Sequence, residues 1–215
     1  MRRTRGRPLP AGRLMPAEAL AFGIGISVAG LILLWVATNP LTFALGLVAL
    51  SSYVLAYTPL KRVTSLCTVV GAVPGAIPPL MGWAAARGSL DRTAWALFAI
   101  LFLWQLPHFL ALSWMYREDY ERGGFPMLAV SDEGGLSTGR QALLYAAALL
   151  PVTLTAGLFA EAGRVFLWGG LAAGLAFLAC AALFARRREV GHARRLFFAS
   201  VLYLPLVLAL MVLDR

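Results

Sequence analysis

Apolar residues occur along this chain in long runs that are separated by short polar segments. A helix needs ~20 consecutive apolar residues to cross the hydrocarbon core of a bilayer. Uninterrupted runs also favour helices over the alternating pattern of barrel strands. The predicted spanning helices cover residues 17–36, 41–57, 65–86, 93–116, 139–159, 165–184 and 195–213. The sequence therefore predicts an all-α membrane protein, a bundle of about seven transmembrane helices in one domain over residues 1–215.

Composition and charge support this prediction and add an orientation. Of the 215 residues, 60% are hydrophobic and only 13% are charged. A net charge of +9 would suggest nucleic-acid binding in a soluble protein. Here the positive-inside rule explains it better, because a cytoplasmic N-terminus places 15 of the 19 basic residues in inside segments. We therefore expect a multi-pass protein of the cell (inner) membrane, its N-terminus cytoplasmic and its C-terminus on the outer face, with no nucleic-acid partner.

Two stretches depart from plain membrane helices. The connection over residues 117–138 is long, lies on the predicted cytoplasmic side, and carries five of the ten acidic residues. Long polar connections between packed helices often carry function. The third predicted helix contains Gly71, Pro74, Gly75, Pro78 and Pro79. Such a helix is expected either to bend and line a pocket or to pack closely through small residues.

The segment 57–64, with sequence YTPLKRVT, joins two membrane helices on the predicted cytoplasmic side. Its adjacent cations Lys61 and Arg62, beside Tyr57, can hold a diphosphate through charge-assisted hydrogen bonds. A plain positive-inside loop would contain the same charges. The spacing alone leaves both interpretations open.

A second group of polar residues begins inside the fourth predicted helix. Gln105 and His108 lie at membrane depth, where polar side chains are costly and often functional. A helical repeat of 100° places Gln105, His108, Leu112 and Asp119 on one stripe. The alternative is that both polar residues form hydrogen bonds to a neighbouring helix. The acids Glu118, Asp119 and Glu121 that follow offer the hard oxygen ligands that Mg²⁺ prefers.

The remaining candidates are weaker. The N-terminal segment contains Arg3 and Arg7, which can bind phosphate or fix topology. Cys67 and Cys180 lie in apolar segments without metal-ligand spacing, so small packing roles are expected. No cleavable signal peptide is evident.

Taken together, these segments resemble the intramembrane aromatic prenyltransferases and, among them, the heme O synthases. The resemblance covers the order and spacing of several blocks over residues 1 to about 130, whereas the last three helices match only as helices. The blocks are RTRGRPLPAG at 3–12, YTPLKRVT at 57–64, GAVPGAIPPLMGW at 71–83, WQLPHFLALSWMYREDY at 104–120 and GGFPM at 123–127.

The resemblance implies a nine-helix bundle, of which this chain would contain the last seven helices. It implies transfer of a farnesyl group from farnesyl diphosphate to a vinyl carbon of heme b, with handover of heme O to heme A synthase or to terminal oxidase assembly. Asp119, aided by Glu118 and Glu121, would hold the diphosphate through Mg²⁺, and Lys61 and Arg62 would face it. The further substrate-binding residues expected are Arg3, Arg7, Tyr57, Gln105, His108 and Tyr120.

The resemblance also has a gap, because the first Asp-rich motif and the first two family helices would lie before Met1. A late start codon, a fragment or a degenerate protein would each explain this, and the abrupt beginning favours the first. A chain limited to these residues is expected to have little or no transferase activity. The alternatives in function are a related prenyltransferase with a quinone-type acceptor and, from a different class, a small membrane transporter.

Overall fold

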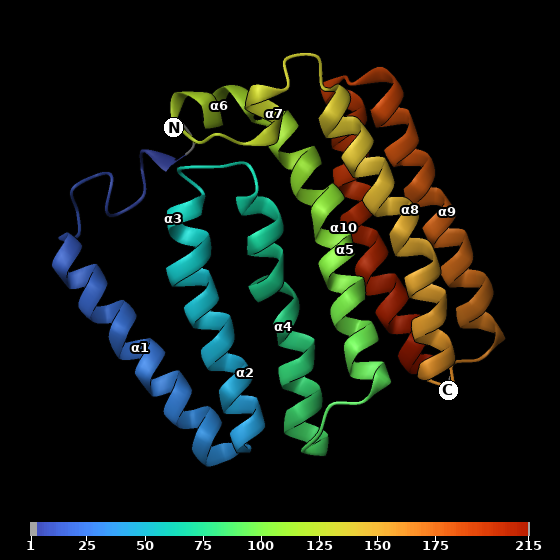
Figure 1. Ribbon diagram of the computed structural model, residues 1–215, viewed down its shortest axis with the longest axis horizontal. Helices are drawn as coiled ribbons and strands as arrows, with labels where there is room; N and C mark the ends of the chain where they lie inside the picture. Colours follow the sequence, from blue (N-terminus) through green and yellow to red (C-terminus); the bar gives the residue numbers. More distant parts are fainter. Residues whose placement is uncertain (1–3, 215) are drawn as a thin grey trace.

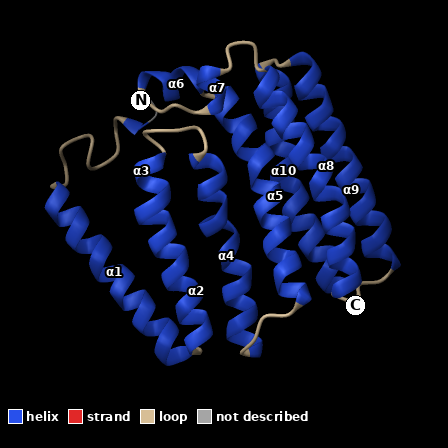
Figure 2. Cartoon of the chain, viewed as in Figure 1, coloured by secondary structure: helices blue, strands red, loops and turns tan. Residues whose placement is uncertain are grey.

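In the computed structural model, which describes residues 4–214, every regular element is a helix (Figures 1 and 2). Seven of them are long and apolar enough to cross a membrane, so the predicted bundle of membrane helices is confirmed. The spanning helices are α1 (Pro16–Ala37), α2 with its continuation (Pro40–Leu60), α4 (Cys67–Arg87), α5 (Arg92–Met115), α8 (Leu136–Phe159), α9 (Arg164–Arg187) and α10 (Val190–Leu213).

The second spanning helix differs from its prediction. It consists of α2 (Pro40–Ser51), a wider π-helical stretch η2 (Ser52–Tyr57) and a short final turn α3 (Thr58–Leu60). The helix therefore runs three residues beyond the predicted end at position 57. π-Helical turns are often found at functional sites, because they change which side chains face a cavity.

Polar caps fix where several spanning helices begin. The Asn39 side chain accepts a hydrogen bond from the Thr42 amide at 2.9 Å, and its own amide group donates to the Ala84 carbonyl of α4 at 2.7 Å. Asp91 accepts from the Ala94 amide at 3.1 Å and so starts α5. These caps satisfy backbone donors that a helix cannot satisfy itself. Asn39 in addition ties the turn after α1 to α4.

The helices α5, α8, α9 and α10 form the packed part of the bundle, which we call the packed cluster (Figure 1). Small residues allow close contact there: an alanine methyl at Gly139 would lie 2.8 Å from the Ala185 backbone, and one at Gly157 would meet the Phe166 ring. Membrane helices associate through such close packing and through polar pairs between helices. One such pair joins Thr153 and Tyr203, whose hydroxyl oxygens lie 2.7 Å apart.

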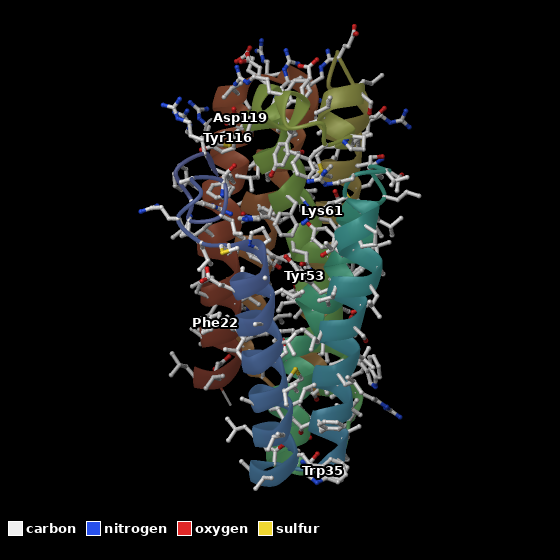
Figure 3. The ribbon with its side chains drawn as sticks, turned by 90° about the vertical axis from the view of Figure 1, so that its left-hand side faces the viewer. Phe22, Trp35, Tyr53, Lys61, Tyr116 and Asp119 are labelled. Carbon is white, nitrogen blue, oxygen red and sulfur yellow. The ribbon has the colours of Figure 1, made fainter. Side chains whose placement is uncertain are left out.

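The N-terminal helices are packed less tightly. Helix α1 diverges from the rest of the bundle, and none of its residues is buried (Figure 1). Phe22 and Trp35, for example, are 69% and 55% exposed on this helix (Figure 3). Helices α2 and α4 lie between α1 and the packed cluster.

One end of the bundle carries the long connections. The short helices α6 (Arg117–Arg122) and α7 (Leu128–Ser131) lie across this end, which also holds the N-terminal segment and the turn after α3 (Figure 1). Lys61 and Asp119 are both found here (Figure 3). The segments that the charge pattern assigned to the cytoplasm therefore share one end. The chain is a multi-pass membrane protein.

Candidate functional site

A pocket of about 540 Å³ opens between α2, η2, α4 and α5, beneath α6; we call it the central pocket. Its walls are mainly apolar, and its polar groups are few, as is usual for sites that bind small organic molecules. Tyr53, Tyr57 and Tyr120 line it together with Gln105. The other lining residues are Ala49, Leu50, Cys67, Thr68, Gly71, Pro74, Gly75, Phe109, Leu112, Ser113 and Met127.

The π-helical stretch η2 places two tyrosines on the pocket. The rings of Tyr53 and Tyr57 lie 5.0 Å apart, between centroids, and both line the cavity. The ammonium group of Lys61 lies over the Tyr57 ring, 5.8 Å from its centroid. A cation at that distance is attracted to the negative face of the ring. Lys61 is thereby positioned directly above a residue of the pocket wall, although it does not line the pocket itself.

Helix α4 forms the opposite wall and stays continuous through Pro74, Pro78 and Pro79. Its glycines let other side chains approach the backbone. A methyl group at Gly71 would lie 2.6 Å from the Tyr57 ring, and one at Gly75 would meet the Gln105 amide oxygen. Of the two interpretations offered for this helix, the lining of a pocket and the close packing are both found, since the same small residues do both.

Gln105 is 6% exposed and reaches from α5 across to α4. Its Nε2 donates a hydrogen bond to the Ala72 carbonyl oxygen at 2.8 Å. A carbonyl can only accept, so this contact fixes which end of the amide is nitrogen. The Oε1 atom is left beside Gly75, next to the pocket.

His108, one turn further along α5, faces a different neighbour. Its ring stacks against Trp104, with centroids 5.2 Å apart, and lies 4.6 Å from Phe197 of α10. Nδ1 lies 2.7 Å from the Ser200 hydroxyl oxygen, and that hydroxyl donates to the Phe197 carbonyl at 2.6 Å. Nδ1 is therefore the donor to Ser200, and in the neutral ring Nε2 carries the lone pair.

The predicted stripe along α5 is thus only partly found. Gln105, Phe109, Leu112 and Ser113 line the central pocket, whereas His108 does not. The helical repeat of 100° per residue correctly places Gln105 and Leu112 on the same side of α5. The side chain of His108 packs against α10 instead.

Helix α6 separates the central pocket from a second hollow. Tyr120 lines the central pocket, whereas Glu118, Asp119 and Arg122 line a surface hollow of about 540 Å³ at the same end of the bundle. Asp119 and Lys61 therefore share no pocket among the described cavities. The rest of this hollow is lined by Trp114, Met115, Tyr116, Arg117, Arg188, Glu189 and Val190.

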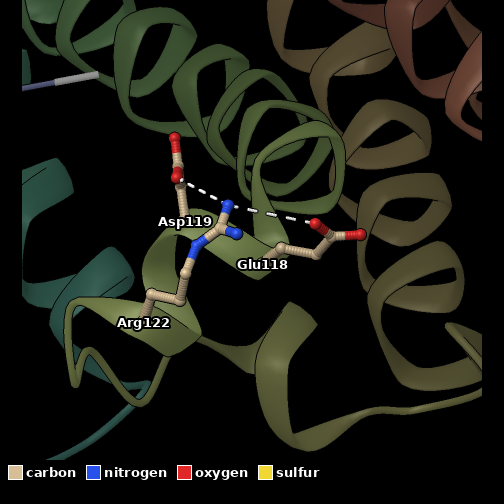
Figure 4. A network of polar contacts seen from close by, with 3 residues as sticks. All are labelled: Glu118, Asp119 and Arg122. Atoms are coloured by element: carbon tan, nitrogen blue, oxygen red, sulfur yellow. Dashed lines mark hydrogen bonds and ion pairs between the residues drawn. The ribbon is translucent and has the colours of Figure 1, made fainter. Parts of the chain in front are cut away.

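The acids on α6 are held by an arginine (Figure 4). The Arg122 guanidinium lies 2.9 Å from Asp119 and 3.9 Å from Glu118. The Asp119 side chain is only 13% exposed, whereas that of Glu118 is 79% exposed. A cation between two carboxylates lowers their mutual repulsion.

The donor set on α6 suits a magnesium ion only in part. Among residues 4–214, no three His, Cys, Asp or Glu side chains come together as a metal-binding group. Glu121 lines neither hollow. Mg²⁺ is commonly held by one or two protein carboxylates together with substrate phosphates. Asp119 and Glu118, which both contact Arg122, fit a magnesium ion that is held partly by substrate phosphates. They do not fit a magnesium site made of protein ligands alone.

Three further predicted residues lie near this end. Arg62 and Arg7 are exposed in the turn after α3 and in the N-terminal segment. Arg3 lies outside the described residues. Nothing in the structure assigns a partner to the side chains of Arg62 and Arg7, so their diphosphate-binding roles stay predictions.

Sequence reasoning missed several pocket residues. Tyr53 could have been found, because it lies one helical turn before Tyr57 on the same face. Cys67 was expected only to pack, yet it lines the pocket, and its sulfur lies 3.9 Å from that of Met127. Met127 follows α6 in the chain and reaches the pocket through the tertiary fold, for which the local sequence has no signal.

The helices around this pocket define a class of protein. A solved structure described by its title as digeranylgeranylglyceryl phosphate synthase in membranes superposes with a TM-score of 0.79. The superposition covers 99% of this chain and 76% of that one, at 16% sequence identity. At that identity the likeness establishes the fold alone, a bundle of membrane helices.

Sequence comparison gives the family. The model of the UbiA prenyltransferase family matches residues 1–202, and the chain belongs to this family. A protoheme IX farnesyltransferase of Solibacter usitatus is 51% identical over the whole chain, which covers 74% of that protein. Another, of Myxococcus xanthus, is 47% identical over the whole chain and 73% of its own length. These relatives favour prenyl transfer over the transporter considered from the sequence.

Proposed function

We propose that this protein transfers a farnesyl group from farnesyl diphosphate to a vinyl carbon of heme b, with water adding to the neighbouring vinyl carbon, giving heme O and diphosphate. The observation that carries the proposal is the central pocket, an apolar cavity whose rim bears tyrosines and, above Tyr57, the ammonium group of Lys61. An isoprenoid chain needs apolar walls, and its diphosphate needs cations. The names of the relatives supply the acceptor and the length of the prenyl chain.

The roles of the residues follow from this arrangement. Lys61 and Arg62 would neutralise the leaving diphosphate, so that the bond between its oxygen and C1 of the farnesyl chain breaks heterolytically. Tyr57 and Tyr120 would line the path of C1 into the pocket. Apolar walls would keep bulk water from the allylic cation. Asp119 and Glu118 would hold Mg²⁺ with the diphosphate oxygens, and this ion, when bound, would further stabilise negative charge on the leaving group.

We place the enzyme in the cell (inner) membrane with the α6 end in the cytoplasm. The charge pattern supports this orientation, because the connecting segments predicted to lie inside, which contain most of the basic residues, meet at that end of the bundle (Figure 1). Heme O would pass from here to heme A synthase or to terminal oxidase assembly.

The test is an assay of membranes that contain the product of the full-length gene, supplied with heme b and farnesyl diphosphate. We expect farnesylated heme from the wild type and a loss of about 100-fold or more in Lys61→Ala and in Asp119→Asn, the size seen when one charge-stabilising group is removed. Leu202→Ala, an exposed change on α10, is the matched control. Unchanged activity in both site variants would refute the site. Prenylation of 4-hydroxybenzoate in place of heme b would identify the quinone-type alternative.

A further inference from the structure

A groove of about 680 Å³ lies between the start of α5 and the end of α8; we call it the lateral groove. Both of these helix ends lie at the end of the bundle away from α6 (Figure 1). The lateral groove and the central pocket share no lining residue within residues 4–214. At ~100° per residue, Ala96 in its wall lies on the opposite side of α5 from Gln105. The lateral groove is therefore separate from the proposed active site.

The inner part of the lateral groove is apolar and nearly as long as one leaflet of a bilayer is thick. Along α8 it is lined from Phe159 back to Pro151, which is about 12 Å of helix. One leaflet contributes about 15 Å to the hydrocarbon core. Ala96 and Ala99 on α5 and Val152 on α8 form its walls, and these short side chains leave room between the two helices. The lateral groove thus has the length and the lining that a lipid acyl chain requires.

The mouth of the lateral groove is held in place by the protein itself. The Thr93 hydroxyl donates a hydrogen bond to the Phe159 carbonyl at 2.9 Å and so fastens the end of α8 to the start of α5. Trp95 lines the groove and is 52% exposed. Trp side chains are enriched at the level of the lipid headgroups. The mouth lies at that level, because α5 begins there and Trp95 stands beside it.

Two charges of opposite sign, Asp91 and Arg92, line this mouth. Both residues are exposed, and neither takes part in an ion pair within the described part of the chain. Asp91 accepts a hydrogen bond from the Ala94 amide through Oδ1, at 3.1 Å, so its second carboxylate oxygen can accept from a ligand. A guanidinium binds phosphate, and a carboxylate binds ammonium, through charge-assisted hydrogen bonds. The mouth is therefore complementary to a headgroup that contains both a phosphate and an ammonium group.

We propose that the lateral groove binds one phospholipid whose headgroup contains a phosphate and a primary ammonium group. Arg92 binds the phosphate, Asp91 accepts a hydrogen bond from the ammonium group, and one acyl chain lies between Ala99 and Val152. The bound lipid belongs to the leaflet at the end of the bundle away from α6. It packs against α5 on the side turned away from the central pocket.

The experiment measures lipid binding to the delipidated product of the full-length gene in micelles, by native mass spectrometry. Phosphatidylethanolamine, which has the primary ammonium group, is compared with phosphatidylglycerol, which lacks it. We expect one tightly bound phosphatidylethanolamine per protein. Arg92→Gln should weaken its binding about fivefold, the effect of one basic residue at a lipid surface. Asp91→Asn keeps a residue that caps helices well, but it should abolish the preference for phosphatidylethanolamine over phosphatidylglycerol.

Two further variants distinguish the lateral groove from the rest of the lipid-facing surface. Ala99→Trp fills the groove and should remove the tightly bound lipid, whichever headgroup it carries. Arg87→Gln is the matched control, because Arg87 lies over the Trp83 ring at 5.0 Å, near the same end of the bundle but outside the groove. Its lipid binding should equal that of the wild type. Only intact folded protein is counted in these spectra, so a poorly expressed variant still gives a binding ratio.

Equal binding of phosphatidylethanolamine by the wild type, Arg92→Gln and Ala99→Trp overturns the proposal, as does tighter binding of phosphatidylglycerol to the wild type. Displacement of the lipid by farnesyl diphosphate also overturns it, because the groove would then belong to the active site. A wild-type dimer that is lost in Ala99→Trp would assign the groove to a second copy of the chain instead. None of these measurements depends on farnesyl transfer, so they stand or fall separately from the proposed function.

Discussion

Gln105 and His108 lie one turn apart on α5, yet Gln105 faces the central pocket and His108 faces the packed cluster. The hydrogen bonds of polar side chains differ between these two regions. In the packed cluster, two pairs of polar side chains are matched with each other: His108 with Ser200, and Thr153 with Tyr203. At the central pocket, Gln105 instead bonds to a backbone carbonyl, that of Ala72, and Pro78 and Pro79 lack the N–H groups that the carbonyls of Pro74 and Gly75 would use in a regular helix.

The comparison teaches that a polar residue at membrane depth is not by itself evidence of a site. Satisfied groups join helices, where their net contribution is small. Unsatisfied groups that face a cavity are the ones that select a ligand. Substitutions in the two regions are therefore expected to separate effects on stability from effects on activity.

The largest effect is expected from Gly157→Ala in the packed cluster. The added methyl group would meet the Phe166 ring, and overpacking of this kind costs ~1–3 kcal/mol. The free energy of unfolding in mixed micelles should fall by that amount, while activity per folded molecule stays constant. Gly23→Ala on α1, with nothing within 4 Å, should not lower stability. Equal stability of the two variants would contradict the tight packing described for α8 and α9.

At the pocket, Gly71→Ala should affect activity more than stability. Its methyl group would lie 2.6 Å from the Tyr57 ring and would displace that ring together with Lys61 above it. We expect kcat/KM for farnesyl transfer to fall about tenfold, equivalent to ~1.4 kcal/mol. Gly82→Ala serves as the control on the same helix. A loss confined to stability would mean that Tyr57 only packs.

Ser200→Ala addresses His108. The change removes the oxygen that accepts from His108 Nδ1 at 2.7 Å, which should cost about 1 kcal/mol of stability. If His108 only packs, heme binding measured by the Soret absorbance stays constant in the folded fraction. A shifted Soret band would instead support the substrate-binding role that the resemblance implies for His108, because Nε2 would have lost its fixed tautomer.

The smallest effect is expected from the pair formed by Thr153 and Tyr203. A double-mutant cycle with Thr153→Val and Tyr203→Phe should give a coupling energy of ~0.6 kcal/mol, the average for hydrogen bonds between membrane helices. Activity should not change in either single variant. Altered activity without altered stability would extend the functional region into the packed cluster.

The membrane helices could be predicted from the sequence, because an apolar run about as long as the bilayer is thick strongly indicates a spanning helix. The predicted ends agree with the structure within five residues, the largest difference being α10, which begins at Val190. The π-helical stretch at Ser52–Tyr57 and the helix α6 were not predicted. A π turn arises from tertiary packing around a cavity, and a helix of six residues has no periodicity to detect.

The candidate site residues were correctly predicted to lie at one end of the bundle. The structure divides them between two hollows instead of placing them in one cavity. Tyr57, Gln105 and Tyr120 line the central pocket as expected. Asp119 lies on the other side of α6, since the break between α5 and α6 at Tyr116 changes the direction of the chain. A helical projection that runs from His108 to Asp119 ignores that break. The metal-binding role of Asp119 and the roles of Lys61 and Arg62 stay predictions.

The contact between Lys61 and Tyr57 has a practical consequence. Lys61 is the only lysine in the sequence, and it is half-buried directly above the pocket wall. Acylating reagents that select primary amines would therefore modify one side chain within residues 1–215. A fluorine or fluorescent tag introduced there would report occupancy of the neighbouring cavity, without the need to engineer an attachment point.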